Sequence, residues 1–87
     1  MSLLKCKFEP GAMKHEVAIY VTGVDGIFES WTDPRDIEVE DPASGSGFVP
    51  VRVINEDTIK NRALVELPVE VIMGGRRIWV PLTSVRR

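Results

Sequence analysis

Short segments in which apolar and polar residues alternate follow one another along the whole chain. They lie near residues 4–9, 15–22, 26–31, 36–40, 48–54, 62–67 (or on to 72) and 76–83, and are rich in valine, isoleucine and aromatic residues. Glycine, proline, asparagine and aspartate stand between them, and these residues favour turns. The pattern predicts β-strands. No window long enough for a helix has a 3.6-residue apolar period.

These segments predict one all-β domain over residues 1–87, a small antiparallel barrel of six or seven short strands. An SH3-like or Sm-like barrel is the first choice, because sequential antiparallel strands joined by short turns build it directly. An OB-like barrel is the second choice, since its usual helix has little sequence to form from. The segment 41–47, DPASGSG, is interpreted as a loop within the domain.

One face of the strands is aliphatic throughout, and it predicts the core. Successive side chains on a strand point to opposite faces. The inward set is Val17, Ile19, Val21, Val49, Val51, Val53, Ala63, Val65, Leu67, Ile78, Val80 and Leu82.

The opposite face also carries large apolar groups, with arginines beside them. The apolar residues are Tyr20, Phe48, Leu64 and Trp79, and the arginines are Arg52, Arg62 and Arg77. Strong curvature could make this face a minor second core, covered by loops such as 41–47. Exposed patches of this composition also mark self-association surfaces. Aromatic rings framed by arginine can stack the bases of single-stranded nucleic acid, and a ligand site is a fourth interpretation.

The charges are unevenly distributed over the chain. The net charge of −2 argues against a general nucleic-acid binder. Residues 25–41 hold seven acidic residues and one arginine, whereas residues 76–87 hold four arginines and no acid. Such asymmetry can orient a domain against a partner or a second copy. The acidic stretch 33–41 lacks the pattern of a calcium loop, and is interpreted as a charged edge that discourages aggregation.

The number of cysteines and the length of the apolar runs indicate the cellular compartment of the protein. Cys6 is the only cysteine, so no internal disulfide can form, which favours a reducing cytoplasm. No apolar run approaches the length of a membrane span, and no signal-peptide core is present. We expect a cytoplasmic protein without membrane contact.

No catalytic constellation assembles from the sequence. His15 is the only histidine and has no Cys/His cluster with which to share a metal. Cys6 would be a nucleophile only with His15 beside it. Phosphate-binding and dinucleotide-binding glycine patterns are absent. We therefore expect no catalytic residue, no cofactor and no metal.

The C-terminal segment 62–85 combines an alternating strand, a hairpin and a second strand with a characteristic ending. The matching residues are Ala63, Val65, Leu67, Trp79, Val80, Pro81 and Val85. This arrangement resembles the ending of small bacterial and phage β-proteins of unknown function. The hairpin between the two strands is longer here than in those proteins. Their last strand has one serine or threonine after its proline, and in this chain either Thr83 or Ser84 could be the matching residue. The resemblance covers about the last 25 residues, supports a β-barrel and implies no catalytic residue.

Together these features predict a non-catalytic interaction or regulatory module that forms a homodimer or meets another protein. The contact residues are expected to be Tyr20, Phe48, Arg52, Arg77 and Trp79. The arginines would pair with acidic groups, such as the 33–41 stretch of a second copy, and charge reversal at Arg76 and Arg77 would weaken that pairing. The alternative is a single-stranded nucleic-acid-binding domain that uses the same face.

Overall fold

A computed structural model describes residues 2–11, 15–71 and 75–87, with only the backbone at 69–71. The described part consists of β-strands and two short 3₁₀ turns. The elements are β1 (Ser2–Pro10), β2 (Val17–Gly23), β3 (Gly26–Thr32), η1 (Pro34–Asp36), β4 (Glu38–Asp41), β5 (Ser46–Asp57), β6 (Arg62–Val71), β7 (Gly75–Pro81), η2 (Leu82–Ser84) and β8 (Val85–Arg86).

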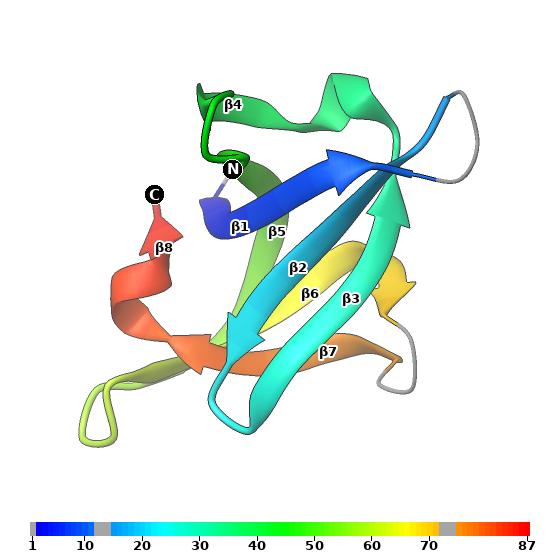
Figure 1. The fold of residues 1–87 in the computed structure, drawn as a ribbon. Coiled ribbons are helices and arrows are strands. Elements are labelled where there is room, and N and C mark those ends of the chain that lie inside the picture. Colours follow the sequence, from blue (N-terminus) through cyan, green and yellow to red (C-terminus); the bar gives the residue numbers. More distant parts are fainter. Residues whose placement is uncertain (1, 12–14, 72–74) are drawn as a thin grey trace.

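The strands form one antiparallel sheet in the order β3-β2-β1-β5-β6-β7, with β4 added on β5 and β8 on β1. Figure 1 shows this sheet curled so that β2 and β3 lie across β6 and β7. The all-β prediction is confirmed, and the sheet forms a half-barrel. Each predicted strand segment has its counterpart, and β8 is an additional short strand.

The long strand β5 belongs to both halves of the sheet. Its first part pairs with β1, from Ser46 to Val51, and its second part pairs with β6, from Arg52 to Asp57. The register shifts between Val53 and Asn55, which marks a bulge and increases the local bend. We call β3, β2, β1 and residues 46–51 the first wall, and residues 52–57, β6 and β7 the second wall.

Backbone hydrogen bonds outside the strand ladders join the two walls and fix one end of the second wall. At the tip of the β2–β3 hairpin, the Val24 N–H donates to the Trp79 carbonyl on β7 (2.9 Å). After β7, the Leu82 N–H donates to the Asn61 carbonyl in the β5–β6 turn (3.0 Å). The β2–β3 hairpin therefore closes over one end of the barrel.

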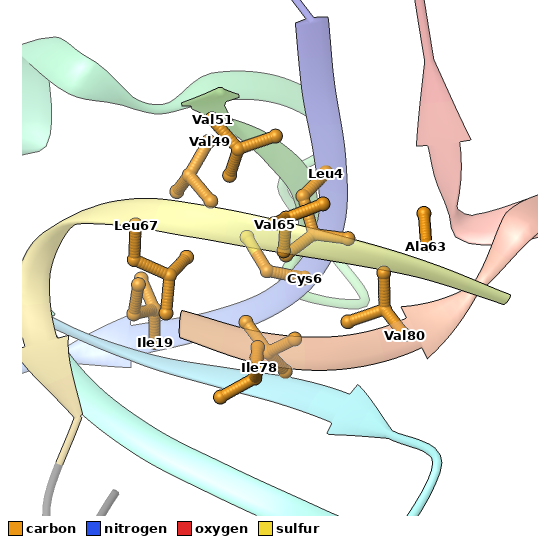
Figure 2. Packing of buried hydrophobic residues seen from close by; sticks show 11 residues of the cluster. Leu4, Cys6, Ile19, Val49, Val51, Ala63, Val65, Leu67, Ile78 and Val80 are labelled. Atoms are coloured by element: carbon orange, nitrogen blue, oxygen red, sulfur yellow. The ribbon is translucent and has the colours of Figure 1, made fainter. Parts of the chain in front are cut away.

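The core lies between the two walls, and Figure 2 shows its side chains converging from both. The predicted core residues Ile19, Val21, Val49, Val51, Ala63, Val65, Leu67, Ile78 and Val80 are buried. Leu4 and Cys6 on β1 complete the cluster. Val53 and Leu82 pack against it partly buried, and Val17 is half-buried outside it, at the start of β2.

The turn before β5 requires glycine at position 45. Gly45 has φ +69°, in the left-handed region, and a Cβ there would lie 2.7 Å from the Phe8 carbonyl oxygen. The Phe8 N–H donates to the Gly45 carbonyl (2.8 Å), so the two backbones are held close together. Only a residue without a side chain fits this approach.

We expect replacement of Leu4 by alanine to lower the free energy of unfolding by about 2–5 kcal/mol, because the side chain is fully buried between the walls. That is a large share of the stability of a small domain. Urea unfolding followed by circular dichroism measures it. The matched control is Ile59→Ala, since Ile59 is 92% exposed, and its effect should stay within about 0.5 kcal/mol. Equal losses in both variants would contradict the described core.

Candidate interaction faces

The residues predicted to form one interaction face lie on two different walls. Tyr20 and Phe48 stand on the outer face of the first wall, in register with Lys7 and Lys5 of β1. Arg52, Arg77 and Trp79 stand on the outer face of the second wall. Because the core separates the walls, these two sets point in different directions. Their part in a contact stays a prediction.

Trp79 is half-buried beneath an arginine of its own chain. The Arg62 guanidinium lies 4.4 Å from the centroid of the Trp79 ring, a cation–π geometry. The same guanidinium is 3.8 Å from the Asp57 carboxylate. Its Nε is buried without a hydrogen-bond partner. The arginine that the sequence places beside Trp79 therefore covers that ring.

Arg52 and Arg77 share one carboxylate on the strand between them. Glu66 on β6 is paired in register with both, and its oxygens lie 3.1 Å from Arg52 and 3.0 Å from Arg77. The hydrogen bond from Arg77 holds the pKa of Glu66 below its usual value. The two predicted contact arginines are thus already paired within the chain.

Phe48 is covered in the same way as Trp79. It is buried in the row between Lys5 and Glu38, and the Arg86 guanidinium lies 4.2 Å from its ring centroid. Arg86 also donates to the Glu38 carboxylate at 2.8 Å. Both rings therefore fit the interpretation of a second layer closed over the sheet, although the covers are arginines and not the 41–47 loop.

Strand β3 differs from the other strands because both of its faces mix apolar and polar residues. Its inner face buries Ser30 (1% exposed) and Thr32 (6%) beside Phe28, whereas on the outer face Ile27 is 72% and Trp31 is 41% exposed. Leaving such apolar groups in water while polar groups are inside is unfavourable for an isolated domain. A contiguous exposed apolar face commonly marks a contact surface. Sequence reasoning missed these residues, because Glu29 shares their side of the strand.

The outer face of β1, β2 and β3 carries charges of both signs around the apolar residues. Its rows across the strands are Glu9–Ala18–Trp31 and Lys7–Tyr20–Glu29, and Thr22 of β2 pairs with Ile27 of β3 beside them. We call this surface the hairpin face. The Tyr20 hydroxyl donates to Glu9 at 2.7 Å, and this bond to a carboxylate raises the pKa of Tyr20.

The residues considered for chemistry lie apart from one another. His15 lines a surface hollow with Asp33, Pro34 and Arg35, and no described hydrogen bond or ion pair joins it to Cys6. Cys6 is buried in the core, and burial raises the pKa of its thiol to about 11. A thiol held protonated is a poor nucleophile at neutral pH.

The acidic stretch 33–41 is partly neutralised by neighbouring groups. Asp33 pairs with Arg35 at 2.8 Å, and that interaction lowers the pKa of Asp33 to about 2. Asp41 accepts hydrogen bonds from Ala43 and Ser44 in the following turn. Within residues 2–11, 15–71 and 75–87, no group of three or more His, Cys, Asp or Glu side chains has a geometry that could hold a metal ion.

Comparison of the chain with protein-family models, curated proteins and solved structures gives no match. Among the residues that the structure describes, no helix is long and apolar enough to cross a membrane.

We expect Arg62→Ala to lower the free energy of unfolding by about 1 kcal/mol, because it removes the stack on Trp79 and the pairing with Asp57. The control is Arg52→Ala, which removes an exposed ion pair only and should cost about 0.5 kcal/mol or less. Thermal and urea unfolding measure both variants. If Arg62→Ala were no more destabilising than Arg52→Ala, Arg62 would not act as a cover.

We expect the Cys6 thiol to react with a disulfide reagent at pH 8 at least about a hundredfold more slowly in the folded protein than in urea, since two pKa units reduce the thiolate by that factor. The unfolded thiol loses its proton from about pH 9 upward and the folded one only near pH 11. Stability should therefore fall as the pH rises between these values. Cys6→Ala should make this slope shallower, and an unchanged slope would contradict the assignment.

Proposed function

We propose that the protein is a non-catalytic interaction module that self-associates as a homodimer through the hairpin face. The single observation that carries this proposal is the exposure of two large apolar side chains on β3, since Ile27 is 72% and Trp31 is 41% exposed while Ser30 and Thr32 are buried on the other face. A partner that covers this face would remove the exposed apolar groups from water, which is the main driving force of association.

A second copy is the partner favoured by the charges of the hairpin face. Tyr20 stands in register between Lys7 and Glu29, and Glu9 pairs with Ala18 in the next row, so positive and negative groups lie side by side on the same surface. Two copies related by a twofold axis bring the same surface to itself, and such a surface must be self-complementary. Because the hairpin face carries both positive and negative side chains, two copies of it can come together without net electrostatic repulsion. Lys5 makes no hydrogen bond or ion pair with any described residue, so it is free to pair across the interface.

The size of the chain gives a further reason for dimerisation. A domain of 87 residues buries a smaller share of its surface than a large domain does. Association adds buried apolar area without lengthening the chain. Tyr20, one of the five residues predicted as contacts, lies on the hairpin face with Trp31, whereas Phe48 lies on the same wall beneath Arg86.

We further propose that the half-barrel is of the SH3-like class and that the protein acts in the cytoplasm. The order of antiparallel strands and short turns supports the first assignment. The lone, buried Cys6 supports the second, because a reduced thiol suits a reducing compartment.

Single-stranded nucleic-acid binding remains the alternative. It would use the aromatic and arginine residues of the second wall, where Trp79 is half-buried beneath Arg62. Salt separates the two functions, since phosphate contacts weaken steeply as salt rises and an apolar interface does not.

We expect light scattering after size exclusion to give the mass of a dimer that persists at high salt. Ile27→Lys should weaken the dimer at least tenfold, because it replaces an exposed apolar side chain of the contact with a charge. Trp31→Ser should act in the same direction.

The matched control is Ile59→Lys, which makes the same change at an exposed isoleucine in the β5–β6 turn. Its self-affinity should equal that of the unaltered chain. A monomer at every soluble concentration would refute the proposal. If Ile27→Lys and Ile59→Lys weakened the dimer equally, the contact would not be on the hairpin face.

A further inference from the structure

A groove lies where β5 passes from the first wall to the second. Its volume is about 580 Å³, within the range of small-molecule sites. Pro50, Val51 and Val53 of β5 and Leu67 and Pro68 of β6 form its apolar lining. The groove arises because β1 pairs with β5 only as far as Val51, and β6 pairs only from Arg52 onward.

Arginines make the rim of this groove positive. Arg52 and Arg76 line it together with Glu66. Both oxygens of Glu66 are already engaged, one with Arg52 at 3.1 Å and the other with Arg77 at 3.0 Å. Arg76 makes no hydrogen bond or ion pair with any described residue. Among the side chains that the structure describes at this rim, arginines therefore outnumber carboxylates, in a chain whose net charge is −2.

We propose that this groove binds a small molecule with an apolar body and one carboxylate group. The apolar body lies on Pro50, Val53 and Pro68, and the carboxylate lies against the guanidinium of Arg76. A planar guanidinium matches a carboxylate in shape and hydrogen-bonding pattern. The apolar walls lower the local dielectric, which strengthens that pairing.

Other occupants fit the groove less well. No aromatic side chain of the described residues lines it, so it offers no ring for a base to stack on. Prolines on both β5 and β6 lack the N–H groups that an added strand would need. An uncharged apolar molecule would make no ion pair with Arg76, which is exposed at the rim. The site lies apart from the hairpin face, so this inference does not depend on dimerisation.

The test is a titration of the ¹⁵N-labelled full chain with sodium octanoate, followed by amide chemical shifts. We expect saturable shifts at Arg52, Val53, Leu67 and Arg76, with a Kd of about 1 mM or tighter for a ligand of this size. The uncharged analogue 1-octanol should bind at least about threefold more weakly, because it lacks the charge that Arg76 recognises. No shifts at these residues, or equal affinity for both molecules, would overturn the proposal.

Arg76→Gln should weaken octanoate about three- to tenfold and leave 1-octanol unchanged. The matched control is Arg35→Gln, which removes the same charge at an exposed position away from the groove. Octanoate should bind this control as it binds the unaltered chain. If both variants weakened octanoate equally, the overall charge and not the groove would govern binding, and the assignment would be wrong.

Discussion

The rest of the structure depends on the bend of strand β5. This strand of 12 residues pairs with β1 in its first half and with β6 in its second, so it carries both walls of the half-barrel. The bulge after Val53 turns the second half toward the core. The aliphatic side chains of both walls can then meet without a helix to cover the sheet. The same bend separates β1 from β6 along the strand, and the groove with Pro50 on its wall opens at that point.

Curvature also explains why some outer residues are covered and others are not. On a strongly curved sheet, outward side chains spread apart, and long arginines can lie over the rings between them. Arg62 covers Trp79 and Arg86 covers Phe48 in this way. Strand β3 ends the sheet and has a paired neighbour on one side only. Trp31 therefore remains 41% exposed on the hairpin face.

Alternation alone was sufficient to predict the strands and most of the core, because burial on one face is a local property of each strand. The arginines that lie over the aromatic rings of the outer face could not be predicted from alternation. Arg86 reaches Glu38 across 48 positions of sequence, and the contact depends on β8, a strand of two residues without a pattern of its own. Which face of β3 is buried could not be predicted from its sequence either. In IFESWT both faces mix apolar and polar residues, and only the packing of β3 against the second wall, which puts Phe28, Ser30 and Thr32 inside, decides which face is buried. The groove depends on where the β1–β5 pairing ends and the β5–β6 pairing begins, and the sequence of one strand alone does not determine these positions.

The charge of the whole chain is a poor guide to what its surfaces bind. At physiological salt, charges act over about one Debye length, roughly 8–10 Å, so a ligand responds mainly to the groups beside it. Among the described side chains, Arg52, Arg76 and Glu66 line the groove, and Arg77 pairs with Glu66 beside it. A long polyanion would extend beyond this region and meet the acidic residues of β4, which pairs with the other part of β5. A compact molecule with a single negative group gains the attraction of the arginines without that repulsion, and this difference favours a small carboxylate over a nucleic acid at this site.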